Sequence, residues 1–202
     1  MEARKVAAIY RLGELTEAIA SGFSPYGQSP AGRGENVIRM IGTKEVQADA
    51  LDLAHLERVT VPDAGKLAPY RVAAGDVLVV IRGGAFRSAV CEEDAAGAIA
   101  GGNLAIIRLK PTAPIGPYLL QSMLSAPAGQ AALRRLAQGS ATLAIRPAML
   151  AGLKIAVPEP EEAQRLEALC RALVALRAMT LTALHAREQV VGGIVGQYVA
   201  AH

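Results

Sequence analysis

Two apolar runs mark the body of this chain. Residues 77–81 and 104–109 carry no polar face, which is typical of strands that are covered on both sides. Residues 7–19 alternate weakly and could form one strand that leads into Ser21-Gly22. Shorter strands are predicted at residues 37–41, 57–61 and 153–157.

Two helical segments follow the second apolar run. Residues 117–124 begin with a proline, which suits the first turn of a helix, and residues 129–137 end before Gln138-Gly139. The pattern predicts an α+β fold with a mixed sheet over residues 1–158, which is long enough to bury a real core.

The C-terminal part, residues 159–202, predicts one long helix. Pro158 and Pro160 end a strand, and acidic residues then stand where a helix dipole favours negative charge. Residues 161–191 contain no proline or glycine, and at ~1.5 Å per residue they would form a rod of about 46 Å.

Leucines form a stripe along this helix. Leu166, Leu169, Leu173 and Leu176 fall at coiled-coil spacing, and the stripe slips through Thr180. It continues through residues 181, 184, 191 and 195, and Leu184 is a candidate for oligomerisation together with the four leucines above. A helix packed on its own domain is one interpretation. The excess length favours a helical partner, either a second copy or another subunit.

Composition predicts a soluble, cytoplasmic protein. No run approaches the ~20 apolar residues of a membrane span, and no apolar signal core follows the N-terminus. Cys91 and Cys170 are far apart and have no metal-ligand spacing, so both are expected to be reduced thiols that pack as small apolar residues.

The net charge is +3 and the pI is near 9.0. Arginines concentrate in glycine-containing loops at residues 31–34 and 82–87, and Arg134-Arg135 adds another pair. Glycine allows close approach of the backbone and arginine offers a planar fork of donors, so a polyanion is a natural ligand. Solvated surface charge is the alternative.

The order of short motifs resembles a known family. The matching segments are residues 11–15, 21–22, 37–41, 70–79, 82–84, 102–107 and 118–122, Gly139-Ser140 before Ile145, and residues 150–158 with Glu162 and Gln164 after them. In this order they resemble a target-recognition domain and the spacer helix of the DNA specificity subunit of type I restriction-modification systems.

The chain departs from that family in two ways. Members usually carry two recognition domains and two spacer helices, but the Gly75-Asp76 strand pattern has no second copy here. The segment 159–164 is also looser than the usual Pro, Glu and Gln pattern. The chain therefore looks like a half subunit, and the resemblance implies a homodimer joined through the helices.

The resemblance implies that loop side chains contact double-stranded DNA. Arginine can span guanine O6 and N7, and glutamine can pair with adenine, while other contacts hold phosphates. The candidates by position are Gln28, Ser29, Arg33, Lys44, Arg82, Arg87, Gln138, Ser140, Thr142 and Arg146. Arg82 and Arg87 are expected to face the DNA rather than pair with Glu92, Glu93 or Asp94.

The sequence does not predict an enzyme. His55, His185 and His202 are dispersed, and Arg82-Gly83-Gly84 lacks the spacing of a nucleotide-binding loop. Asp76 follows a glycine at a strand start, where a turn carboxylate is the ordinary explanation. No cofactor is expected for this chain.

Two function classes remain open. The resemblance implies a specificity subunit that directs an adenine methyltransferase subunit and, in full systems, a restriction nuclease subunit. The other class is a non-catalytic interaction protein that uses the helix for oligomerisation and the globule for a protein ligand. Salt separates them, because phosphate contacts weaken steeply with salt and an apolar interface does not.

Overall fold

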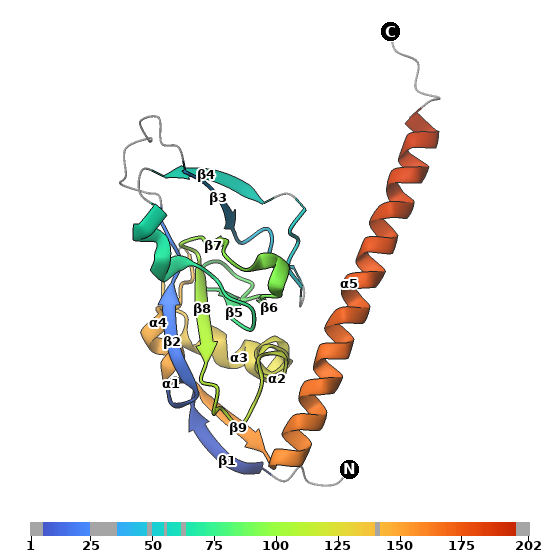
Figure 1. Ribbon diagram of the computed structural model, residues 1–202. Coiled ribbons are helices and arrows are strands. Elements are labelled where there is room, and N and C mark those ends of the chain that lie inside the picture. The colour runs from blue at the N-terminus through green and yellow to red at the C-terminus, as the bar shows by residue number, and fades with distance from the viewer. Residues whose placement is uncertain are drawn as a thin grey trace.

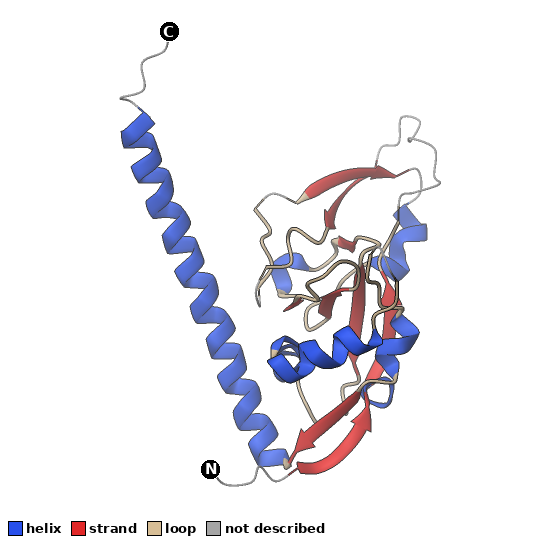
Figure 2. Ribbon diagram, turned by 180° about the vertical axis from the view of Figure 1, so that it is seen from behind, coloured by secondary structure: helices blue, strands red, loops and turns tan. Residues whose placement is uncertain are grey.

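The computed structural model describes residues 6–24, 36–47, 50–54, 56–61, 64–139 and 142–196. Three small sheets and several short helices form a globule, and the long helix α5 leaves it at one end (Figure 1; Figure 2 shows the reverse side). This is the α+β class expected from the sequence, with the long helix at the C-terminus.

The prediction of one strand over residues 7–19 is wrong. The segment forms strand β1 (Val6–Arg11), a helical turn α1 (Leu12–Leu15) and strand β2 (Thr16–Ser21). Leu12 and Leu15 are both buried, and their spacing of three suits a helical turn rather than an alternating strand. The two strands consequently belong to different sheets.

The central sheet has the strand order β2-β8-β5-β6. Strands β5 (Val77–Val80) and β8 (Leu104–Leu109) lie in its middle, and β6 (Ser88–Val90) lies at one edge. All four residues of β5 are buried, which confirms the prediction of a strand covered on both faces. Val77 and Val79 enter one core cluster, while Leu78 and Val80 enter the second.

Three helices cover the face of the sheet that carries the first cluster. They are α2 (Pro117–Ser125), α3 (Pro127–Leu136) and α4 (Pro147–Ala151). Each begins with proline, whose missing amide hydrogen would have no partner in the first turn in any case. Their buried leucines join the alternate side chains of β5 in one core.

A third, mixed sheet lies against the second core cluster. Strand β3 (Asn36–Ile41) pairs antiparallel with β4 (Glu57–Val61) and parallel with β7 (Ile99–Ala100). Two 3-10 turns, η1 (Ala64–Tyr70) and η2 (Glu93–Ala95), border it. In both views this sheet occupies the end of the globule remote from β1 (Figures 1 and 2).

Strand β9 (Lys154–Pro158) closes the globule by pairing antiparallel with β1. Helix α5 (Pro160–Gly196) follows directly and has 37 residues. It continues past the stretch 161–191 that lacks proline and glycine, through Gly192 and Gly193. One glycine in a helix costs only about 1 kcal/mol relative to alanine, so a glycine pair need not end it.

Helix α5 bears on the expectation about membranes. It is long enough and apolar enough to cross a bilayer by length and composition, with a mean hydropathy of 1.3 over an 18-residue window that is 0% buried. Length and composition thus identify an exposed apolar helix, and the nature of its partner has to be argued from other features.

Candidate nucleic-acid interface and helix junction

Several predicted DNA-contacting loops meet on the globule. The backbone of Arg82 forms a β-bridge with Ala144, which also bridges to Gln138. The Gly83 amide donates to the Leu143 carbonyl at 2.9 Å. Gly83 has a φ of 110°, a conformation that glycine adopts without strain. These contacts place the 82–84 turn beside the 138–144 loop.

A second contact attaches the loop that follows β3. The Arg87 guanidinium donates to the Thr43 carbonyl at 2.7 Å, and Lys44 is the next residue. Among the described residues, neither Arg82 nor Arg87 forms an ion pair with Glu92, Glu93 or Asp94. The exposed polar candidates brought together in this way are called the loop surface: Lys44, Arg82, Arg87, Gln138, Thr142 and Arg146.

The remaining candidates, Gln28, Ser29, Arg33 and Ser140, lie outside the described residues. Arg146 is the N-cap residue of α4, and its exposed side chain is therefore positioned by the start of that helix. The loop surface thus depends on pairings between segments far apart in the chain, with the 82–87 turn between two other loops.

An ion pair that was not predicted from the sequence joins Asp76 to Arg108 of β8. Asp76 is 1% exposed and accepts hydrogen bonds from Arg108 Nε at 2.8 Å and Nη2 at 2.7 Å. It also accepts the Ala73 amide at 2.8 Å, so it closes a turn as expected. The hydrogen bond to Asp76 raises the pKa of Arg108. The available signal was one arginine inside the apolar run of β8.

The geometry of the Asp76–Arg108 pair indicates a structural role. The Asp76 carboxylate accepts hydrogen bonds from the bidentate arginine and from an amide donor, so its oxygens are occupied by contacts within the fold. Burial raises the pKa of the Cys91 thiol, and the negative charge of Asp76 raises it further. A thiol held protonated is a poor nucleophile. The described residues contain no group of side chains suited to hold a metal ion.

Glu167 fastens the base of α5 to the globule. Its carboxylate accepts the backbone amides of Tyr118 at 3.2 Å and Leu119 at 2.7 Å. These amides belong to the first turn of α2, where helical carbonyl partners are lacking and the dipole favours an anion. Glu167 therefore acts as an N-cap supplied by another helix.

Gly116 makes room for this cap. A Cβ at Gly116 would lie 2.2 to 2.6 Å from the atoms of the Glu167 carboxyl group, so any side chain would displace it. Sequence alone gave no sign of this contact, because Gly116 and Glu167 are distant and the glycine has an ordinary φ. Only the folded structure, which brings the two residues together, reveals it.

Tyr118 adds a second link between α5 and the globule. The Arg171 guanidinium carbon lies 4.8 Å from the centre of the Tyr118 ring, and the Tyr118 hydroxyl donates to Glu92. Burial, followed by the hydrogen bond to Glu92, raises the pKa of Tyr118 to about 12. Glu167, Arg171 and Tyr118 together form what is called the helix junction.

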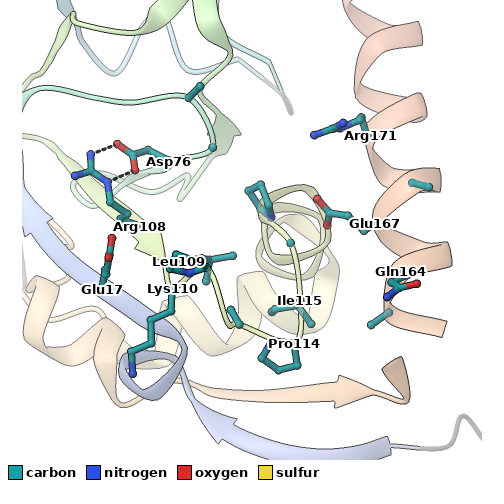
Figure 3. Close-up of a pocket in the computed structure, with 18 of the residues that line it drawn as sticks. Glu17, Asp76, Arg108, Leu109, Lys110, Pro114, Ile115, Gln164, Glu167 and Arg171 are labelled. Atoms are coloured by element: carbon teal, nitrogen blue, oxygen red, sulfur yellow. Dashed lines mark hydrogen bonds and ion pairs between the residues drawn. The ribbon is translucent and has the colours of Figure 1, made fainter. Parts of the chain in front are cut away.

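An open cleft of about 1100 Å³ lies beside the helix junction, between α5 and the loops at Asp76 and Arg108 (Figure 3). Figure 3 shows Glu167 and Arg171 on the α5 side and the Asp76–Arg108 pair on the other side. Small alanine side chains line much of the helix wall. Asp76, Arg108, Glu167 and Arg171 are engaged in the contacts described above, and Lys110 donates to the Glu14 carbonyl at 2.8 Å.

Beyond the helix junction, α5 is exposed. Leu166 is the exception among the predicted oligomerisation residues, because it packs on the core of its own globule. Leu169 is 62% exposed, Leu173 45%, Leu176 61% and Leu184 48%. These four residues, together with Val191, are called the apolar stripe.

Comparison with known proteins gives the fold a context. No protein-family model and no curated protein matches this chain. Among solved structures, it is similar to the HsdS subunit from Thermoanaerobacter tengcongensis, with a TM-score of 0.58, 18% identity and coverage of 93% of this chain and 46% of that one.

Two further structures give the same result. The type I restriction-modification S subunit from M. genitalium has a TM-score of 0.57 and 11% identity, over 91% of this chain and 42% of that one. A chain from a study of complex assembly and conformational transition in the type I system has a TM-score of 0.54 and 19% identity, over 95% and 46%. The chain thus spans less than half the length of these proteins, and its fold is that of one half of a type I restriction-modification specificity subunit.

Proposed function

We propose that this chain is a non-catalytic half subunit that binds double-stranded DNA in a sequence-specific manner and directs a partner methyltransferase subunit to its site. The supporting observation is the fold of half a specificity subunit, covering 93% of the chain, together with cationic loops that converge on the globule. In full systems a restriction nuclease subunit would join the complex. This chain would act in the cytoplasm.

The loop surface supplies the two kinds of contact that recognition needs. Arg82, Arg87 and Lys44 can hold phosphates, which fixes the position of the protein on the duplex without reading sequence. Gln138 and Thr142 carry groups that can reach base edges. The exposed face of Gly83 allows the backbone to approach the DNA closely, since nothing lies within 4 Å of the place where its Cβ would be.

Two copies of the chain would pair through the apolar stripe in antiparallel orientation. Counted from Thr180, stripe positions fall 4, 7 and 11 residues away in both directions: Leu176 and Leu184, Leu173 and Arg187, Leu169 and Val191. These steps of three and four keep one helix face. The spacing of these positions is the same in both directions, as a two-fold axis through Thr180 requires, although Arg187, which is not part of the apolar stripe, stands opposite Leu173.

The residue at this axis tolerates burial. The Thr180 hydroxyl donates to the Leu176 carbonyl at 2.8 Å, so its polar group is already satisfied within its own helix. Arg187 can bury its methylene stem against Leu173 of a second copy and keep its guanidinium in water.

A bilayer fits this surface less well than a second helix. Arg187 and Glu188 lie within the apolar part of α5, and Arg177 precedes them by about three turns. Charges in the centre of a bilayer cost about 2.5–3.5 kcal/mol each on the insertion scale. In a helix pair the guanidinium of Arg187 can reach water from the seam, and Arg177 and Glu188 lie beside the seam.

Methylation mapping in a host that carries this chain and its partner methyltransferase tests the proposal. Two identical half subunits should produce modification at an inverted repeat. The two half-sites should lie roughly one helical turn, ~34 Å, apart or slightly more. Unmodified DNA, or modification at a continuous non-palindromic site, would refute it.

A further inference from the structure

The outer face of the β3–β4 ribbon carries an unusual pair of side chains. The register places Arg39 opposite Arg58 and Val37 opposite Thr60. Successive residues of a strand alternate between faces. The intervening pair, Ile38 and Val59, faces inward and packs in the third core cluster.

Like charges that stand directly opposite on an antiparallel pair destabilise the ribbon. Both arginines are exposed, and neither forms an ion pair with a carboxylate in the described part of the chain. Arg39 donates to the Asp94 carbonyl at 3.1 Å, which orients it but leaves its charge uncompensated. The pair is therefore suited to a negatively charged ligand.

Val37, the apolar neighbour of the two arginines, also favours such a ligand. Val37 is 60% exposed, although a β-branched residue on a strand would ordinarily be expected to pack against something. It lies on the same face as the two arginines, with Thr60 opposite it. A face that combines guanidinium groups, a hydroxyl and a methyl-bearing side chain matches the edges of DNA bases better than phosphates alone.

We propose that the β3–β4 ribbon enters the major groove and that Arg39 and Arg58 read guanine bases there. The inference rests on the proposed function and names a reading element within it. The major groove is about 12 Å wide and admits a two-stranded ribbon, and arginine pairs with guanine O6 and N7. Val37 and Thr60 then contact the neighbouring base edges.

The position of the ribbon suits this role. Strand β3 ends at Ile41, and the loop that follows contains Thr43, the acceptor of the Arg87 bond, and Lys44. The ribbon is therefore continuous with the loop surface, which holds phosphates beside it. It also lies at the end of the globule remote from β9 and the start of α5 (Figures 1 and 2).

The sharpest test compares full-length wild-type protein with Arg58→Ala. The Arg58 side chain donates no hydrogen bond to another described residue and forms no ion pair with one, so its removal leaves the β3–β4 pairing in place and relieves the repulsion from Arg39. The variant should unfold at the same or a higher temperature than wild type. This separates loss of recognition from loss of folding.

Each protein is incubated with duplexes of randomised sequence at one salt concentration, and the bound pool is sequenced. Wild type should enrich a motif. Arg58→Ala should lose roughly 10- to 100-fold of the preference for guanine at one position of each half-site, the range expected for one bidentate contact. Preference at the other positions should remain, and Arg39→Ala should act at a different position. Arg165→Ala, at the opposite end of the globule, is the charge-matched control.

An unchanged motif with Arg58→Ala, or a uniform loss of affinity at every sequence, would overturn the ribbon proposal while leaving the proposed function intact. A wild-type protein that enriches no motif would overturn the proposed function and the ribbon proposal together.

Discussion

The loop surface and the apolar stripe are both exposed in a single chain, but they differ in chemistry. The loop surface carries Lys44, Arg82 and Arg87 on backbone that is held by hydrogen bonds to other loops. The stripe carries leucines, and Leu176 is 61% exposed. Exposure alone therefore does not identify the partner of either surface. The charge of a surface and the stiffness of its support indicate which partner it can take and how salt affects the contact.

The largest expected effect concerns the stripe. Replacing Leu169 and Leu173 with glutamate places two charges in the proposed seam, and burying unpaired charges costs several kcal/mol. We expect light scattering to give the mass of one chain for the variant and of two chains for wild type. Loss of the dimer should not depend on salt in the way that DNA binding does.

Ala175→Glu with Ala178→Glu is the matched control, because these exposed residues lie on the other side of α5 and add the same charge. The control should keep the wild-type mass. An unchanged mass for the leucine variant would exclude the stripe as the dimer contact.

The next effect concerns the loop surface. Charge reversal at Arg82 and Arg87 should weaken binding to all DNA sequences about equally if both hold phosphates. The slope of log affinity against log salt should fall by about 2, since each phosphate contact contributes roughly 0.9. Fluorescence anisotropy over a salt series measures both quantities.

Lys154→Glu with Arg165→Glu provides the control, with the same change of net charge at the end of the globule where α5 begins. Affinity that survives reversal of Arg82 and Arg87 at moderate salt would show that the DNA lies elsewhere. An affinity that does not change with salt would favour the alternative function, an interaction protein with an apolar ligand.

A smaller effect is expected at the helix junction, which connects the two surfaces. Glu167→Ala should destabilise the globule by about 1 kcal/mol, as the loss of an N-cap does. Amide exchange at Tyr118 and Leu119 should accelerate. Gly116→Ala should reproduce both effects, because its Cβ displaces the carboxylate. Glu162→Ala, one turn earlier on α5, should leave exchange at both amides unchanged.

The smallest effect is a pH dependence at Tyr118. Its pKa is raised to about 12 in the folded chain, against about 10 for an ordinary tyrosine. Folded protein therefore binds a proton more tightly, and this contribution to stability is complete below pH 10 and is lost as pH rises to 12. After allowance for solvent screening it is on the order of 1 kcal/mol. Urea unfolding at several pH values should show the decline, and Tyr118→Phe should diminish it.

The apolar runs were sufficient to predict β5 and β8, because burial on both faces leaves a continuous hydrophobic signal. They were insufficient at residues 7–19, where the helical turn that begins at Leu12 is held by a distant part of the chain: the Leu12 amide donates to the carbonyl of Leu153, the residue before β9, at 2.8 Å.

The candidate site was less accessible from sequence than the fold. Arginines in glycine loops could be named, but the bond from Arg87 to Thr43 spans 44 residues and required the fold. The register that sets Arg39 against Arg58 depends on which residues of two strands face each other. A shift by one position would turn both side chains to the other face, so spacing along the chain could not predict the pair.

The pairing of β1 with β9 has a consequence for how such chains diversify. The first described strand and the last strand before α5 lie side by side, with Arg11 opposite Lys154. Everything between them forms a closed loop of chain that begins and ends at one place. Residues 12–153 could therefore be exchanged for another sequence that folds between the same two strands, provided that it keeps the amides of α2 that Glu167 caps. If the chain acts as proposed, such a replacement would change the DNA site and leave the apolar stripe of α5 unchanged.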